Sequence, residues 1–190
     1  MRNRCLTVLL LFVTTGFLVS CATPKGVTKQ EQRDYVLKMR EKTLAKLYAQ
    51  KPETKAMIKK AAGYGVFSNI GTHIFLLAGG SGYGVVVDNS TGQKTYMKMR
   101  SVGVGLGLGV KDFRVVFLFK NKRVLSEFVE KGWEFGAQAD AAAKSGEKGG
   151  AVGGEAYVET GIAIYQLTEA GVALQATIAG TKYWKDKDLN

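Results

Sequence analysis

Between Ser101 and Val110 glycine alternates with valine or leucine, and this alternation constrains the fold more than any other feature of the sequence. Successive side chains of a β-strand point to opposite faces, so a strand here has one face of bare backbone and one aliphatic face. A glycine in a strand costs about 0.5–1 kcal/mol relative to alanine. Several in a row therefore need a packing reason, such as the close approach of an aromatic side chain, a helix or the opposite wall of the sheet. We predict a small, tightly curled sheet or half-barrel.

The residues before the glycine-rich region have helical periodicity. Thr28 and Glu31 form a T-x-x-E capping box, the start signal of a helix. Apolar residues then recur at three- and four-residue intervals up to residue 51, and Pro52 prevents simple continuation. A second short helix is predicted over residues 53–62, and a third over residues 121–131 that covers the sheet.

Strand signals dominate the rest of the chain. Two strands are predicted to flank the GGSGYG segment of residues 79–84, and turn residues follow at 88–92. Further strands are expected at 114–120, 155–167 and 172–180, the last two joined by a hairpin turn at 168–171, with a flexible polar loop at 144–154. Helices followed by runs of strands indicate an α+β fold. We expect N-terminal basic helices, then a Gly-rich, strongly curled antiparallel β-sheet or half-barrel with one covering helix.

The first twenty residues have the pattern of an export signal. Arg2 and Arg4 precede an apolar run over residues 6–19, which is shorter than the ~20 residues of a membrane span. The run ends in Leu-Val-Ser-Cys, which resembles the lipobox of bacterial lipoproteins; an ordinary secretory signal with a chance cysteine is the alternative. The resemblance implies that residues 1–20 are cleaved, that Cys21 is acylated, and that Ala22 directs the protein to the outer membrane, facing the periplasm. Residues 21–27 are then a lipidated tether and residues 28–190 a single domain.

The composition argues against an enzyme. One histidine and two cysteines cannot build the common zinc sites, and the mature chain would keep no thiol for a disulfide, because Cys5 leaves with the signal and Cys21 is acylated. The chain lacks a GxGxxG motif, a P-loop and a nucleophile elbow. His73 has no matched nucleophile, and Glu155 and Glu159 have no indicated pocket. We therefore expect no catalysis, no metal and no cofactor.

Positive charge is concentrated at the start of the expected mature domain. The whole chain has a formal net charge of +11, and residues 28–60 hold ten basic against four acidic side chains. Residues four apart share a helix face, which aligns several of these lysines. The predicted lipid-binding residues are Lys38, Lys42, Lys46, Lys55, Lys59 and Lys60. The alternative interpretation of this pattern is an ordinary solvated helix face.

Six motifs in a fixed order resemble the SYLF domain, also called the Ysc84 domain. They are AAGYGVF at 61–67, GGSGYGVVV at 79–87, SVGVGLGLG at 101–109, DFRVVFLF at 112–119, FGAQADAAA at 135–143 and AGVALQATIAG at 170–180. The likeness runs from about Thr28 to Trp184, and the loop at 144–154 is longer and more charged than the family pattern. The resemblance implies a lipid-binding module, since eukaryotic members bind phosphoinositides partly through a basic segment before the sheet, and yeast-type members also bind actin. Residues 28–60 match that segment in position and charge.

Two functional hypotheses follow. In the first, a lipid-anchored protein binds anionic phospholipid or phosphoinositide-like head groups through its basic helices; an exported bacterial protein would meet neither actin nor ordinary phosphoinositide pools, so bacterial anionic phospholipids are the expected ligand. In the second, an envelope structural or interaction protein docks a protein or a cell-wall polymer without recognising lipid. Nucleic acid is not an expected partner, because the aromatic residues form no stacking platform and an exported lipoprotein rarely meets nucleic acid.

Overall fold

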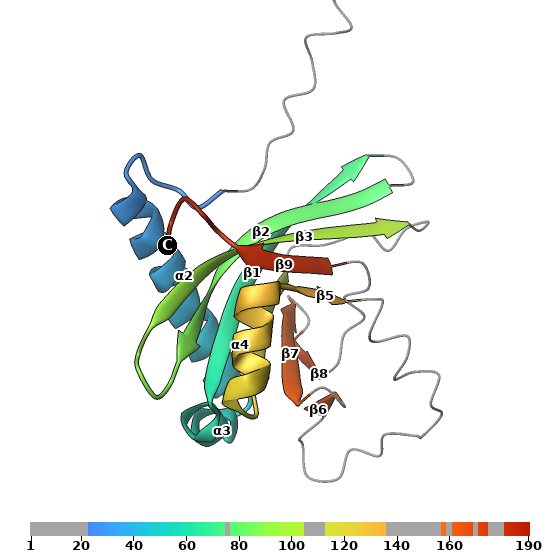
Figure 1. Ribbon diagram of the computed structural model, residues 1–190. Coiled ribbons are helices and arrows are strands. Elements are labelled where there is room, and N and C mark those ends of the chain that lie inside the picture. The colour runs from blue at the N-terminus through green and yellow to red at the C-terminus, as the bar shows by residue number, and fades with distance from the viewer. Residues whose placement is uncertain are drawn as a thin grey trace, which may run out of the picture.

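The computed structural model describes residues 23–74, 77–104, 113–135, 157–158, 161–168, 171–174 and 181–190 (Figure 1). Its helices are α2 (Lys29–Gln50), α3 (Thr54–Lys60) and α4 (Lys122–Lys131). Its strands are β1 (Gly63–Ile74), β2 (Leu77–Asp88), β3 (Lys94–Val104), β4 (Phe113–Phe119), β5 (Trp133–Phe135), β6 (Tyr157–Val158), β7 (Ile162–Thr168), β8 (Gly171–Leu174) and β9 (Thr181–Lys185).

The strands of the described residues form one nine-stranded sheet. Its order is β5-β9-β3-β2-β1-β4-β7-β6, β8 pairs with β7, and every pairing is antiparallel. The sheet is strongly curled, with α2 and α3 on one face and α4 on the other (Figure 1). The predicted α+β fold is confirmed. The predicted covering helix is α4, and the basic helices cover the opposite face.

The helix ends follow the local signals in the sequence. The Thr28 hydroxyl accepts from the Glu31 amide, and the Glu31 carboxylate accepts from the backbone of Thr28 and Val27, which lowers the pKa of Glu31. Asn121 caps α4 by accepting from the Val124 amide at 3.0 Å. Gly132 ends α4 with a positive φ of 73°, a conformation that glycine adopts without strain.

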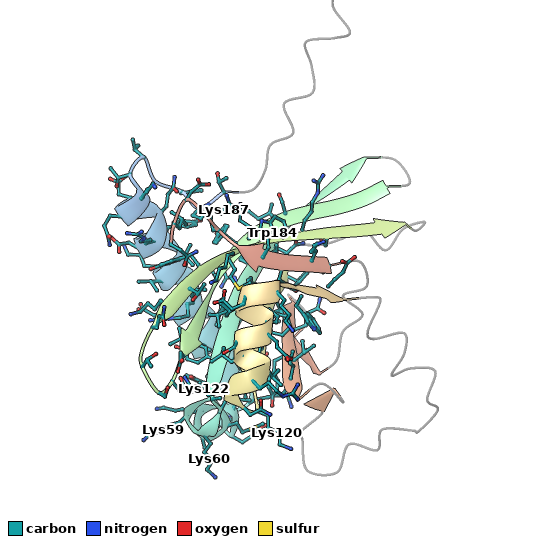
Figure 2. The ribbon with its side chains drawn as sticks, in the orientation of Figure 1. Lys59, Lys60, Lys120, Lys122, Trp184 and Lys187 are labelled. Carbon is teal, nitrogen blue, oxygen red and sulfur yellow. The ribbon has the colours of Figure 1, made fainter. Side chains whose placement is uncertain are left out.

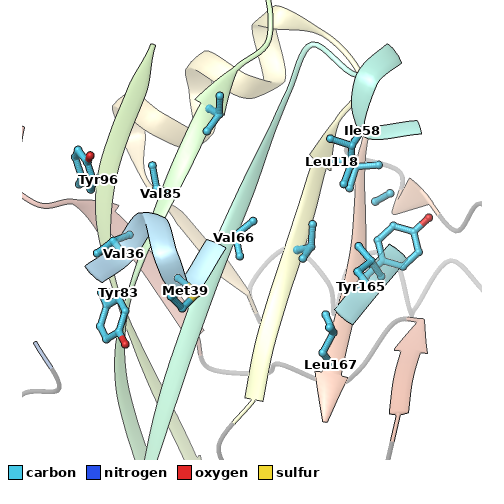
Figure 3. Packing of buried hydrophobic residues seen from close by; sticks show 14 of the residues in the cluster. Val36, Met39, Ile58, Val66, Tyr83, Val85, Tyr96, Leu118, Tyr165 and Leu167 are labelled. Carbon is cyan, nitrogen blue, oxygen red and sulfur yellow. The ribbon is translucent and has the colours of Figure 1, made fainter. Parts of the chain in front are cut away.

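The two faces of the sheet bury different cores. The α4 side holds an aromatic cluster of Phe67, Phe117, Phe119, Phe128, Trp133 and Tyr183, whose ring centroids lie 4.8–6.5 Å apart along its contacting pairs. The α2 side is mostly aliphatic and buries Val36, Met39, Leu47, Ile58, Val66, Val85, Val116 and Leu118, among others (Figure 3). β4 contributes to both cores, since its side chains alternate between the faces.

Glycines of β2 explain how the aromatic cluster comes so close to the sheet. The prediction that residues 79–84 separate two strands is wrong, because they lie inside β2. A side chain at Gly80, Gly82 or Gly84 would point to the α4 side of the sheet. A Cβ on Gly84 would overlap the Phe67 ring, and one on Gly82 would come within 2.9 Å of Met99. Bare backbone here lets Phe67 and Met99 lie directly on the sheet.

The strands after β4 agree only in part with the sequence-based prediction. The segment predicted as one strand over 155–167 contains two described strands, β6 and β7, with a turn at Gly161, where φ is 77°. The hairpin at 168–171 is confirmed by the pairing of β7 with β8. β5 and β9 were not predicted. Some predictions fall outside the described residues. These concern Gly105, Gly107 and Gly109 of the alternating segment, the loop at 144–154, Glu155, Glu159, the first 22 residues with Cys21, and the side chain of His73.

Candidate lipid-binding surface

The inner side of α2 is apolar and sets which residues face outward. Val36, Met39, Thr43 and Leu47 are buried against the sheet at three- and four-residue spacing. Every predicted lysine on α2 is exposed: these are Lys38, Lys42 and Lys46. The exposed surface of the helix also carries Asp34 and Glu41, so it is mixed in charge.

Two arginines of α2 belong to the packed structure. Arg33 donates from Nε to the Leu189 carbonyl at 2.8 Å, and its guanidinium lies 5.9 Å from the centre of the Tyr96 ring. The side chain of Arg40 is only 16% exposed and lies 3.4 Å from the Glu41 carboxylate. Arg33 thus ties the start of α2 to the end of the chain, and neither arginine is fully available to a ligand.

Helix α3 presents its lysines to solvent because the sheet holds its other side. Thr54 and Ile58 are buried, whereas Lys55, Lys59 and Lys60 are exposed. Beyond the β2 end, the Asn89 amide donates to the Ile58 carbonyl at 2.6 Å and to the Ala61 carbonyl at 2.9 Å. These bonds satisfy carbonyls at the C-terminal end of α3, which have no partner within the helix. Asn89 therefore fixes the position of the three lysines.

Lys120 joins this group from a distant part of the sequence. The amide of Ala62, just after α3, donates to the Phe119 carbonyl at 2.9 Å, and this bond places the end of β4 beside the end of α3. Lys120 is exposed and lies at the same end of the molecule as Lys59 and Lys60 (Figure 2). We call Lys55, Lys59, Lys60 and Lys120 the α3 end. Lys120 was not predicted, because an isolated lysine after a strand carries no local signal.

Lys122 lies nearby but has a carboxylate partner. Its ammonium donates to the Asp88 carboxylate, and this bond holds the pKa of Asp88 well below its usual range. The Ser90 hydroxyl and amide also donate to Asp88. The charge of Lys122 is therefore compensated within the protein.

The two helical layers differ in charge. The segment with α2 and α3, residues 28–60, has ten basic and four acidic side chains, a difference of +6. The segment with α4, residues 121–132, has three basic (Lys122, Arg123, Lys131) and two acidic side chains (Glu127, Glu130), a difference of +1. The basic side of the sheet is thus the α2 side.

A small cavity on the opposite side does not suit an anion. It measures about 120 Å³ and lies between α4 and the adjoining ends of β2 and β3, with Asp88, Glu130 and Lys185 in its lining. The Lys185 ammonium lies 2.7 Å from the Glu130 carboxylate, so its charge is already paired. Carboxylates at two points of the wall would repel a phosphate.

Within the described ranges, no group of three or more His, Cys, Asp or Glu side chains could hold a metal ion. Among the helices of the same residues, none is both long and apolar enough to cross a bilayer.

No protein-family profile matches the chain. The chain is similar to Beta cell expansion factor A from Aeromonas veronii, with 37% identity over 162 residues. The alignment covers 85% of this chain and 60% of the relative, so the chain spans less than two thirds of that protein's length. The name of the relative identifies no ligand, substrate or partner, and the SYLF resemblance stays a prediction.

Proposed function

We propose that this protein is a bacterial lipoprotein, anchored through an acylated Cys21, whose non-catalytic SYLF-like domain binds anionic phospholipid head groups. Its expected place is the outer membrane, facing the periplasm. The observation that carries the proposal is the α3 end, where Lys120 joins Lys55, Lys59 and Lys60 although about 60 residues separate them in the sequence. Lys38, Lys42 and Lys46 extend the exposed positive charge along α2.

The energetics suit reversible attachment to an anionic surface. Each basic residue close to such a surface contributes about 1 kcal/mol, so four lysines together contribute about 4 kcal/mol before the cost of ordering. The acyl chains of Cys21 would supply the stable attachment, since several chains on one residue make release negligible. The lysines then select anionic lipid and orient the domain.

Co-sedimentation with vesicles tests lipid binding. The mature chain with Cys21→Ser, which prevents acylation, is mixed with vesicles of phosphatidylglycerol and phosphatidylcholine, or of phosphatidylcholine alone. We expect binding to the first only, and loss of binding as salt rises toward 1 M, where the Debye length falls to about 3 Å. Equal binding to both vesicles, or binding unchanged by salt, would rule out the electrostatic mechanism. Absence of lipid binding would favour the alternative of an envelope interaction protein.

The anchor has its own test. Mass spectrometry of the mature wild-type protein is expected to find an N-terminal Cys21 with a diacylglycerol and an N-acyl chain. An unmodified N-terminus would remove the anchor from the proposal and leave lipid binding by the domain to be judged on the vesicle result.

A further inference from the structure

Part of the sheet on the α2 side lies beyond the residues that α2 buries. Val66 in β1 and Tyr96 in β3 are buried in the α2-side core. Because side chains alternate along a strand, Ile70 and Arg100 point to the same side as these residues. The register places Arg100 opposite Lys182 of β9, and Trp184, two residues on, shares this side. We call Ile70, Arg100, Lys182 and Trp184 the open sheet face.

The open sheet face combines apolar and cationic side chains at the surface. Ile70 is 41% exposed and Trp184 is 37% exposed; with Val27, they are the exposed large hydrophobic residues among those whose side chains the structure describes. Arg100 is exposed. Lys182 is exposed as well, and its ammonium lies 3.6 Å from the Glu134 carboxylate. Trp184 is paired across the strands with Lys98, whose ammonium lies 3.1 Å from Asp186 and 2.9 Å from Asp188, and Arg100 is the next residue of β3 on this side. A partly exposed tryptophan near an arginine is typical of a membrane interface, where the indole lies at head-group depth and the guanidinium pairs with phosphate.

The C-terminal segment links this face to the start of α2, where the tether ends. The segment after Trp184 runs back to α2, where the Leu189 carbonyl accepts from Arg33. Val27, just before α2, is 96% exposed, and Pro24 is buried. Since the chain is held from Pro24, the three residues back to Cys21 span at most about 11 Å. An acylated Cys21 would therefore keep the bilayer surface close to this part of the molecule.

The open sheet face lies apart from the α3 end. Figure 2 shows Trp184 and Lys187 toward the end of the molecule where α2 begins, and Lys59, Lys60 and Lys120 at the other end. The 22 residues of α2 separate the two by about 33 Å. Both belong to the side of the molecule that carries the tether and the basic helices, so a bilayer lying along this side reaches both.

We infer that the open sheet face is a second lipid contact, in which Trp184 enters the head-group region and Arg100 binds a lipid phosphate. The inference rests on the proposed binding of anionic phospholipid and adds an orientation, with the α2 side toward the bilayer and α4 away from it. A lipid surface fits better than a protein partner, because the tether brings the bilayer to this face.

The protein has one tryptophan on each side of the sheet, which makes the test direct. Trp184 belongs to the open sheet face, and Trp133 packs in the aromatic cluster of the α4 side. Trp133→Phe leaves Trp184 as the reporter, and Trp184→Phe leaves Trp133 as the matched control. Both are made in the mature Cys21→Ser chain. They are mixed with phosphatidylglycerol–phosphatidylcholine vesicles, with and without brominated lipid as a quencher.

We expect the emission of Trp184 to shift to shorter wavelength and to be quenched by brominated lipid, while that of Trp133 stays unchanged. We expect Arg100→Gln to weaken vesicle binding about fivefold and Arg123→Gln, on the exposed side of α4, to leave it unchanged. If the protein co-sediments with the vesicles but the emission of Trp184 does not change, the inferred orientation is wrong and the proposed function still stands. Absence of vesicle binding by the parent Cys21→Ser chain would overturn both the inferred orientation and the proposed function. A shift at Trp133 but not at Trp184 would place the α4 side on the bilayer and contradict the inference.

Discussion

The two helical layers on this sheet differ in what they bury and in what they expose. The layer of α4 covers a cluster of aromatic rings and has a net charge of only +1. The layer of α2 and α3 covers mainly aliphatic residues and has an excess of six positive charges. Aromatic rings bury more area per residue than valine or leucine, so each aromatic residue of the α4-side core removes more apolar surface from water. Both faces therefore bury a core, and the α2 side also carries the positive charge on which the proposed lipid binding depends.

The glycine-rich strands of the curled sheet allow its two faces to pack differently. The glycines of β2 let Phe67 and Met99 lie against the backbone on the α4 side. On the other side, Val85 and Tyr83 of the same strand pack under α2. The cationic helices thus pack on a sheet whose opposite face is filled by the aromatic cluster.

The largest effect is expected from Phe117→Ala in the aromatic cluster. The Phe117 ring contacts Phe67, Phe128, Trp133 and Tyr183 with centroids 5.1–5.8 Å apart. Removing it should lower the free energy of unfolding by about 4 kcal/mol, measured by chemical denaturation. Vesicle affinity, measured where the variant remains folded, should not change. A decrease in the free energy of unfolding of less than about 1 kcal/mol, or weaker vesicle binding by the folded variant, would contradict this difference between the two layers.

A smaller effect on stability, with an effect on binding, is expected from Asn89→Ala. The change removes both amide bonds to α3 and leaves the Ile58 and Ala61 carbonyls without that donor, at a cost of about 1–2 kcal/mol. Because α3 loses its fixed position, vesicle affinity should fall as well. Ser90→Ala in the same turn is the control, since the Ser90 hydroxyl donates to Asp88 and not to α3. Unchanged vesicle affinity in Asn89→Ala would show that α3 needs no such support.

The smallest effect concerns the ion pair of Asp88 and Lys122. The pKa of Asp88 is lower in the folded protein than the value of about 3.9 in an unfolded chain. The pair therefore stabilises the fold above about pH 4, and its contribution is lost as the pH falls toward the folded pKa. Lys122→Met should lower stability by at most about 1 kcal/mol at pH 7. The difference from wild type should narrow below about pH 4; thermal melts showing a constant difference between pH 7 and pH 3 would contradict the assignment.

Local signals predicted the helices well and the sheet less well. The capping box at Thr28, the cap at Asn121 and the stop at Gly132 act within a few residues, so periodicity and capping located α2 and α4. β5 and β9 are short strands that form by pairing across the sheet, since β9 pairs with β3 and β5 pairs with β9. A five-residue segment such as 181–185 carries too little pattern to indicate such a partner.

The candidate surface was predicted only in part, because some of its residues come together through contacts between distant segments. Lysines in the helical segment could be assigned to exposed faces from spacing alone. Lys120 could not, because it joins the α3 end through a contact between Ala62 and Phe119 that no local pattern shows. The open sheet face was also missed, since Ile70, Arg100 and Trp184 come from three strands and meet only through their register.

If the proposed function holds, the layer of α2 and α3, and not the layer of α4, contacts anionic lipid. The most direct measurement compares two variants of the mature Cys21→Ser chain that each lose two exposed positive charges. These are Lys59→Gln/Lys60→Gln in α3 and Arg123→Gln/Lys131→Gln in α4. In co-sedimentation with phosphatidylglycerol–phosphatidylcholine vesicles, we expect the α3 double variant to lose about thirtyfold in affinity and the α4 double variant to lose almost none. Equal losses, or a larger loss in the α4 double variant, would contradict this expectation.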